Sequence, residues 1–300
     1  MNSFVDQPLL NQNEISQLLA SGAAVDAQAR GQLNQRLNSG SSKASLMGSG
    51  TEFDDLRLFQ IGDDPRQIDW RASARSQETL TRTYRNELQQ PLQLVVDRNA
   101  SMRFGTKKRL KVTQAARLSL WLSGIYHQQY YALGAFLLEQ QPKLFDCRVG
   151  IDWLNLLSEA MVAPAPPSET SETNWQSVLS QLLSETPSGS KVFLISDFIS
   201  LNASHRVLLG ELTARTSVSA FIISDPIERD PKALLGSELT WGSQRFLVED
   251  QAALTRIEQS YLNRVSDIKD TLSQSGIPLS EVCSSIDHFS VDLLAGEYHE

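Results

Sequence analysis

The sequence is poor in cysteine and histidine, with two cysteines and four histidines among 300 residues. Cys147 and Cys283 are too few and too far apart for a disulfide framework or a cysteine-based metal site. Both lie in apolar runs of strand character, so we expect buried free thiols. The histidines are scattered, and no two have the spacing of a metal-ligand pair. Disulfide scaffolds and cysteine-based metal sites are therefore excluded.

Long apolar runs and the common catalytic motifs are also missing. No segment approaches the roughly 18 apolar residues of a membrane span. The start, Met-Asn-Ser-Phe-Val-Asp, lacks the basic and apolar regions of a signal peptide. The sequence contains no Gly-x-Ser-x-Gly elbow, Walker-type lysine loop or Gly-x-Gly-x-x-Gly turn. We expect a cytoplasmic protein without a transmembrane segment and without catalytic activity.

Excess positive charge is absent as well. The formal net charge is -8 and the sequence pI is about 5.1. A nucleic-acid grip normally appears as a basic domain face, so we expect no nucleic-acid partner. With 41% hydrophobic residues, the chain is long enough for one large core or a core with an appendage.

The most informative stretch runs from Leu92 to Asp97 and continues into Arg98-Asn99-Ala100-Ser101. An apolar, β-branched run that ends in a carboxylate and leads through a polar loop into a helix is typical of a buried parallel strand. Open α/β sheets bind ligands at the carboxyl ends of such strands. Asp97, Asn99 and Ser101 alternate along the loop, so their oxygens can face one hard cation such as Mg²⁺.

Two further runs, 191–197 and 217–225, repeat this pattern and end in Asp197 and Asp225. Alternating strand and helix patterns predict a doubly wound, mostly parallel sheet of the α/β class, with the three aspartates on one rim. The expected strands are 79–84, 92–97, 130–138, 142–148, 191–197, 217–225 and 279–283, with 130–138 and 142–148 forming a hairpin. The expected helices are 110–124, 151–161, 174–183 with Thr173 as its cap, and 251–274.

We divide the chain into three parts. Residues 1–48 form an N-terminal extension with short helices at 14–20 and 27–37, which either packs on the main body or is mobile. Residues 49–88 form a charged and aromatic segment packed on the main domain, and residues 89–300 form the α/β domain.

The segment from Thr51 to Arg75 interleaves acidic, basic and aromatic residues around a Gly-Asp-Asp-Pro turn. Such density favours either an internal ion-pair network or a surface that recognises a partner. Trp side chains are usually anchored in packing, so we expect Asp69 and Trp70 to have a structural role. The candidate residues are Arg57, Asp63, Asp64, Arg66, Asp69, Trp70, Arg71 and Arg75.

This segment strongly resembles the signature of the bacterial family catalogued as domain of unknown function 58 (DUF58). The matching residues are Arg57, Phe59, Gly62-Asp63-Asp64, Arg66, Ile68-Asp69-Trp70 and Ser73-Ala74-Arg75. The resemblance continues through Met102-Arg103-Phe104-Gly105-Thr106, 111–117, Ile195-Ser196-Asp197-Phe198 and Asp225-Pro226-Ile227-Glu228, to the C-terminus.

The resemblance implies a variant of the von Willebrand factor A fold with a metal-ion-dependent adhesion site. That site uses an Asp-x-Ser-x-Ser loop, a Thr from a second loop and an Asp from a third. The implied ligands are Asp97, Asn99, Ser101, Thr173 and Asp197, around Mg²⁺, with Ca²⁺ or Mn²⁺ not excluded. Asn99 replaces an expected Ser, and Ser171-Glu172 replace glycines. The alternative is that Asp97 and Asp197 only bind loop N–H groups at helix N-termini.

The resemblance further implies a non-catalytic module that works with a MoxR-type AAA+ ATPase, as adaptor or partner in protein complex assembly or maturation. The client protein is not identified by any sequence feature. Two other functions stay open, namely a metal-dependent phosphohydrolase, in which the ion polarises a phosphoryl oxygen, and a structural scaffold with a degenerate metal site.

Overall fold

A computed structural model of the chain describes residues 7–37, 49–59, 68–76, 78–85, 91–164, 173–241, 244–248 and 250–291. The chain divides into two compact units. Unit 1 contains residues 1–42 and 91–300, and unit 2 contains residues 43–90.

Unit 1 is built on a six-stranded sheet of order β10-β7-β6-β3-β4-β5 within the described ranges. All neighbouring strands are parallel except β5, which pairs antiparallel with β4. This arrangement confirms the predicted α/β class with a mostly parallel sheet. The strands are β3 (Pro91–Asp97), β4 (Ala132–Leu138), β5 (Lys143–Arg148), β6 (Lys191–Ser196), β7 (Ser217–Ser224) and β10 (Leu279–Cys283).

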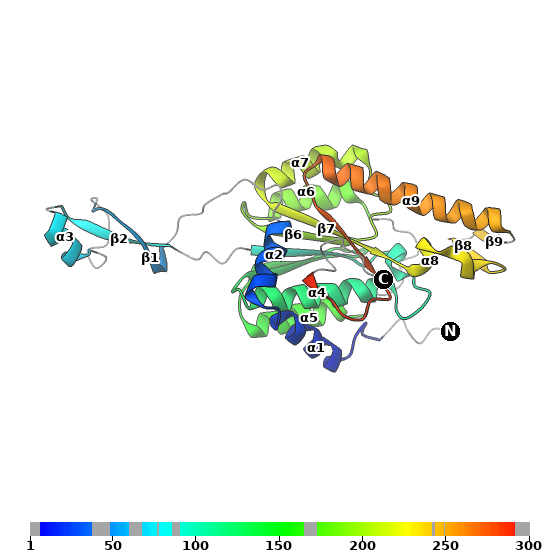
Figure 1. Cartoon of the computed structure of the whole chain (residues 1–300), viewed down its shortest axis with the longest axis horizontal. Coiled ribbons are helices and arrows are strands. Elements are labelled where there is room, and N and C mark those ends of the chain that lie inside the picture. The colour runs from blue at the N-terminus through cyan, green and yellow to red at the C-terminus, as the bar shows by residue number, and fades with distance from the viewer. Residues whose placement is uncertain are drawn as a thin grey trace. The chain divides into compact units, whose positions relative to one another are not determined.

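Helices cover both faces of this sheet because its central strands are apolar on both sides. In β3, Leu94 and Val96 belong to one core cluster, whereas Val95 between them belongs to the other. Figure 1 shows α4 and α5 on one face and α6, α7 and α9 on the other. The helices are α4 (Lys111–His127), α5 (Ile151–Val162), α6 (Trp175–Glu185), α7 (Arg206–Arg215) and α9 (Gln251–Gln274).

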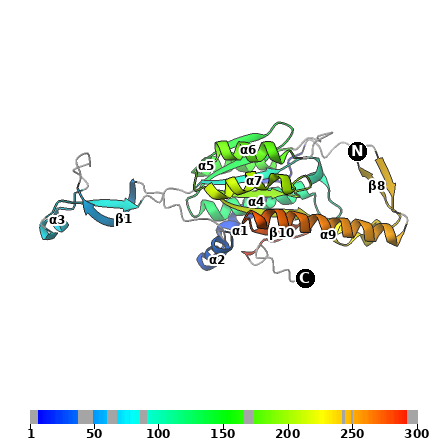
Figure 2. The same cartoon turned by 90° about the horizontal axis from the view of Figure 1, so that it is seen from above.

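Smaller elements connect the strands and helices. Helix α9 extends past the sheet toward the two-stranded β8–β9 ribbon (Figure 2). Ile227, Leu234, Val248 and Leu254 form a separate small core at that end of the unit. These elements are η2 (Ala100–Arg103), η3 (Ala203–His205), α8 (Pro226–Arg229), η4 (Pro231–Leu234), β8 (Glu238–Trp241) and β9 (Gln244–Leu247).

Two N-terminal helices, α1 (Gln12–Ala23) and α2 (Ala27–Leu37), also belong to unit 1. Ile15 and Leu18 of α1 are buried in the same core cluster as the inner face of α4. The two backbones approach closely where glycines face each other's helix. A Cβ at Gly22 would lie 2.1 Å from the Trp121 carbonyl oxygen, and one at Gly124 would lie 2.3 Å from that of Leu19.

Unit 2 contains an antiparallel pair, β1 (Ser49–Leu58) and β2 (Leu80–Arg85), and the short helix α3 (Trp70–Ser76). The Ser73 hydroxyl oxygen accepts a hydrogen bond of 2.8 Å from the Leu80 N–H, so α3 is tied to the start of β2.

Most predicted elements are present with bounds within a few residues, but two expectations were wrong. Helix α6 is capped by Asn174, whose side-chain oxygen accepts from the Ser177 N–H at 3.1 Å, and not by Thr173. The Thr173 hydroxyl instead donates a hydrogen bond to Asp97. Cys147 and Cys283 are free, as predicted, but both are only partly buried.

No helix within the described ranges has both the length and the apolar character that a membrane crossing requires.

Candidate functional site

The candidate site lies where the sheet changes its direction of winding. From β3 the chain passes through α4 to β4 on one side, and from β6 it passes through α7 to β7 on the other. Because the two crossovers diverge from neighbouring parallel strands, the loops after β3 and β6 lie at the topological switch point, where open α/β sheets bind ligands. Asp97 ends β3 and Asp197 follows β6, so both carboxylates lie at this switch point.

Asp97 is the organising side chain of the loop after β3. Its Oδ1 accepts from the Asn99 N–H at 3.0 Å and from the Asn99 side-chain nitrogen at 3.1 Å. Its Oδ2 accepts from the Thr173 hydroxyl at 2.7 Å and from the Ser196 hydroxyl at 2.6 Å. The Asn99 nitrogen also donates to the Thr173 hydroxyl at 2.8 Å. Asp97 therefore joins three segments that are distant in sequence.

The electrostatic environment of Asp97 is unfavourable for its negative charge. The pKa of the Asp97 carboxyl is raised to about 6, chiefly by burial and in addition by the nearby negative charge of Asp197. The hydrogen bonds from Ser196, Asn99 and Thr173 act in the opposite direction because they stabilise the ionised form. A cation placed between Asp97 and Asp197 would relieve this repulsion.

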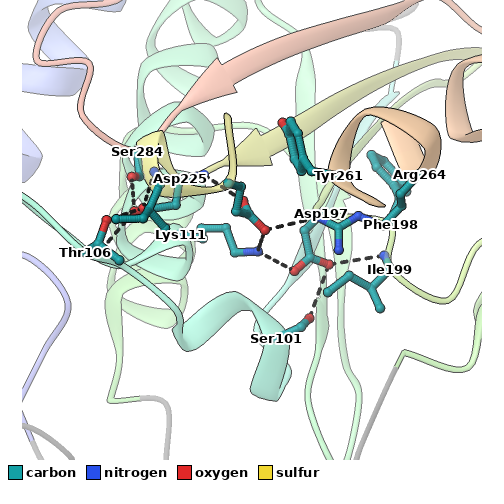
Figure 3. Close-up of polar contacts among 12 residues, drawn as sticks. Ser101, Thr106, Lys111, Asp197, Phe198, Ile199, Asp225, Tyr261, Arg264 and Ser284 are labelled. Carbon is teal, nitrogen blue, oxygen red and sulfur yellow. Dashed lines mark hydrogen bonds and ion pairs between the residues drawn. The ribbon is translucent and has the colours of Figure 1, made fainter. Parts of the chain in front are cut away.

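Asp197, in the loop after β6, heads a chain of alternating charges (Figure 3). Its Oδ1 accepts from the Ser101 hydroxyl at 3.2 Å, and its Oδ2 accepts from the Lys111 ammonium at 2.9 Å. Lys111 also contacts Glu228 at 3.3 Å, and Glu228 contacts Arg264 at 3.1 Å. Burial alone would lower the pKa of Lys111, but the attraction of Asp197 and Glu228 prevails and the pKa is raised.

A strained residue fixes the loop after β6. Phe198 has φ of 52°, a left-handed conformation that is costly for a bulky residue. Its buried ring stacks on Trp175 with the ring centroids 5.2 Å apart, and its N–H donates to the Ser196 hydroxyl at 2.9 Å. The Ser200 hydroxyl donates to the Thr173 carbonyl at 2.6 Å. These contacts hold Thr173 and Asp197 in a fixed relation.

Asp225, the third strand-end aspartate, is on the same rim but serves another purpose. Its carboxylate accepts from the Ser284 hydroxyl at 2.9 Å and from the N–H and hydroxyl of Thr106. It also caps α8, with Glu228 closing the capping box. The prediction that three strands end in aspartates on one rim is thus confirmed, and Asp225 has a structural role in joining the loop of Thr106 to β10.

The five predicted metal-site residues lie in two hydrogen-bonded groups at the switch point. Asp97, Asn99 and Thr173 form one group, and Ser101 pairs with Asp197 in the other. Carboxylate and hydroxyl oxygens are the donors that Mg²⁺ prefers, so the residues present fit that ion. Asn99 directs its side-chain nitrogen, not its oxygen, at Asp97. Within the described ranges, no three His, Cys, Asp or Glu side chains gather as a possible metal cluster.

Sequence reasoning missed Lys111, Ser196 and Glu228 as members of the site. A lysine as the first residue of a helix was one signal, because the positive end of the helix dipole disfavours a cation there. Such a residue usually has a nearby carboxylate. Ser196, directly before Asp197, was a second signal, since it is a polar residue at the end of the apolar run 192–195.

The signature residues of unit 2 are only partly described. Asp63, Asp64 and Arg66 lie outside the described residues, and of Arg57 only the backbone is described, in β1 opposite Thr81. Asp69 does have a structural role, since its Oδ1 accepts from the N–H groups of residues 71 and 72 at 3.0 Å. Trp70 contradicts the expectation of an anchored ring, because it is 70% exposed. Arg71 and Arg75 beside it are exposed too.

Comparison with known families decides the relationship suggested by these residues. The sequence profile of the family described as "Protein of unknown function DUF58" matches residues 55–234, more than half of the chain. The chain belongs to the DUF58 family. The match includes the signature segment from Arg57 and the loops after β3 and β6, so the candidate site of this DUF58 protein lies inside the matched region.

Curated relatives are uncharacterized proteins. Those from Mycobacterium bovis and Mycobacterium tuberculosis are 37% identical over 83 residues, which is 26% of this chain and 26% of each relative. The DUF58 chain thus matches about a quarter of the length of these relatives.

Among solved structures, an aerotolerance-related membrane protein from Bacteroides fragilis is 6% identical, with a TM-score of 0.33 over 61% of this chain and 98% of that one. An uncharacterized membrane spanning protein from Vibrio fischeri is 15% identical, with a TM-score of 0.23 over 62% and 98%. Similarity at this level supports no argument about function.

Proposed function

We propose that this DUF58 protein is a non-catalytic, Mg²⁺-dependent interaction module of the von Willebrand factor A type in the cytoplasm. It acts with a MoxR-type AAA+ ATPase, as adaptor or partner in the assembly or maturation of a client protein. The observation that supports the proposal best is the convergence of Asp97, Ser101, Thr173 and Asp197 at the switch point of the sheet. Hydroxyl-rich ligation would leave an ion with residual affinity for a partner's carboxylate.

In this proposal the chain's own residues position the ion and the partner. Thr173 and Ser101 supply neutral oxygens, while Asp97 and Asp197 hold the negative charge behind them. The Phe198–Trp175 stack keeps the loops of Asp197 and Thr173 in place, so binding requires little rearrangement. The ion would supply one open coordination position for an acidic side chain.

Unit 2 offers a second surface for a partner. Trp70 presents an exposed ring, and the exposed Arg71 and Arg75 add positive charge on the same short helix. Tryptophan and arginine are the residues that most often dominate the energy of protein interfaces. We propose that this surface contacts the ATPase, whereas the rim of unit 1 contacts the client.

The test is capture of a purified MoxR-type ATPase from the same organism, together with its client, on the immobilised full-length chain. Wild type is compared with Ser101→Ala, which removes one hydroxyl of the site, and with Ser204→Ala, which removes an exposed hydroxyl that donates to Asn202, outside the proposed ligand set. We expect client capture to be lost in EDTA and in Ser101→Ala and retained in Ser204→Ala. Trp70→Ala should weaken ATPase capture by about tenfold or more.

Other results would contradict the proposal in distinct ways. Client capture that is insensitive to EDTA contradicts the metal dependence and favours a scaffold with a degenerate metal site. The ion pair between Lys111 and Asp197 supports that second candidate, because it balances the charge of Asp197 without a metal. Turnover of a generic phosphoester that is abolished by Asp97→Ala would instead support a phosphohydrolase.

A further inference from the structure

The candidate metal site already contains a positive charge. The Lys111 ammonium lies 2.9 Å from Asp197 Oδ2, and the lysine side chain is only 1% exposed. Figure 3 shows it reaching from the start of α4 toward Asp197, whose other oxygen is bound to Ser101. One proposed ligand of the metal, Asp197, is thus paired directly with this buried cation, and a second, Ser101, is linked to it through Asp197.

Lys111 has a second carboxylate within reach. Glu228 Oε1 lies 3.3 Å from the ammonium, and Glu228 is itself fixed, because its Oε2 accepts from the Asp225 N–H at 2.8 Å. Arg264 balances part of the charge of Glu228 from its other side. A small displacement of the ammonium from Asp197 to Glu228 would therefore leave it buried and paired, which avoids the large cost of an unpaired buried charge.

An ammonium ion at this position must repel a divalent cation bound by the same aspartate. Like charges a few ångströms apart in a partly buried site repel strongly, because the interior screens them much less than water does. Mg²⁺ therefore binds Asp197 only weakly while Lys111 stays beside it. Tighter binding requires that Lys111 move to Glu228.

We infer that Lys111 is a built-in counter-cation of Asp197 and competes with a divalent metal ion for this carboxylate. The inference rests on the metal site of the proposed function and deepens it. In the absence of metal, Lys111 keeps the rim assembled. When the metal ion is bound, the ammonium moves to Glu228. The affinity for the metal is therefore set by how strongly Lys111 prefers Asp197 over Glu228.

The experiment is calorimetric titration of the full-length protein with MgCl₂. Lys111→Met removes the charge at similar volume, and Lys111→Arg keeps the charge. Lys191→Met is the matched control. Lys191 is also a buried lysine, but it lies at the start of β6, whereas Asp197 follows the end of that strand. We expect Lys111→Met to bind Mg²⁺ at least about tenfold more tightly than wild type. Lys111→Arg and Lys191→Met should bind as wild type does.

A second readout follows thermal unfolding in EDTA and in excess MgCl₂. Lys111→Met should melt below wild type in EDTA, because Asp197 loses its counter-cation, and should recover most of that loss with Mg²⁺. Mg²⁺ should stabilise wild type less than it stabilises Lys111→Met, because wild type binds the ion more weakly. If Lys111→Met does not fold, Lys111→Gln replaces it, because the amide keeps a donor to Asp197 without the charge.

Two results would overturn the inference. Equal or weaker Mg²⁺ binding by Lys111→Met, beside measurable binding by wild type, refutes competition and leaves the proposed metal-dependent function standing. No Mg²⁺ binding by wild type, Lys111→Met or Lys111→Gln refutes both the competition and the metal dependence of the proposed function.

Discussion

At the scale of single residues, the site combines a predictable part and an unpredictable part. Asp97, Ser101 and Asp197 follow apolar strands, so their position on the rim could be inferred from sequence alone. The partner of Asp197 could not, because Lys111 lies 86 residues away and belongs to a helix that reads as ordinary core. The direction of the Asn99 amide was equally hidden, since Asn carries both a donor and an acceptor.

Lys191 provides a prediction for the pH dependence of stability. Burial lowers the pKa of Lys191 to about 8, from 10.5. Between pH 8 and 10.5 the folded state therefore loses this proton while the unfolded state keeps it. The unfolded state then binds more protons, so the contribution of Lys191 to the free energy of unfolding rises with pH across this window, by about 3 kcal/mol.

The measurement compares urea unfolding of wild type and Lys191→Met from pH 7 to pH 10.5. We expect the variant to be the more stable protein at pH 7 and the advantage to shrink as pH rises. Lys143→Met is the control, because the side chain of Lys143 is exposed, and its difference from wild type should stay flat. A constant difference for Lys191→Met would contradict the lowered pKa.

At the scale of elements, local pattern predicted the bounds of some elements without error, whatever their length. Helix α9 and strand β10 have the predicted bounds, because amphipathic period and capping act locally. Helix α4 is buried on all sides and not only along one stripe, which local pattern does not predict. The reason is tertiary, because α1 covers a side of α4 that would otherwise face water.

The contact between α1 and α4 gives a second prediction. A Cβ at Gly22 would meet the backbone of Trp121 at 2.1 Å, so Gly22→Ala must push the two helices apart. We expect a loss of about 2 kcal/mol or more in the free energy of unfolding, as for overpacked cores. Chemical denaturation monitored by tryptophan fluorescence measures this loss.

The matched control is Gly31→Ala. Gly31 is also a helical glycine in the N-terminal part, but a Cβ there has no atom within 4 Å. This substitution should raise the free energy of unfolding by about 0.5 to 1 kcal/mol, because it reduces the freedom of the unfolded chain. Equal effects of the two substitutions would show that α1 does not pack on α4 as described.

At the scale of the whole molecule, the signature segment belongs to unit 2, which is inserted in the sequence between residues 42 and 91 of unit 1. We predict that residues 43–90 can be replaced by a Gly/Ser linker of about 20 residues, which spans roughly 25 Å, without loss of the α/β fold. The shortened chain should unfold cooperatively and bind Mg²⁺ as the full chain does, but should not capture the ATPase. A shortened chain that fails to fold would show that unit 2 stabilises unit 1.

The discontinuity of unit 1 also has a consequence for synthesis on the ribosome. Helix α1 leaves the exit tunnel long before α4, and all of unit 2 is made between them. At typical elongation rates this interval lasts roughly ten seconds. During that time Ile15 and Leu18 have no α4 to pack against, so α1 cannot reach its native place until α4 has been made. The nascent chain must therefore keep an apolar helix out of wrong associations until residue 127 has emerged.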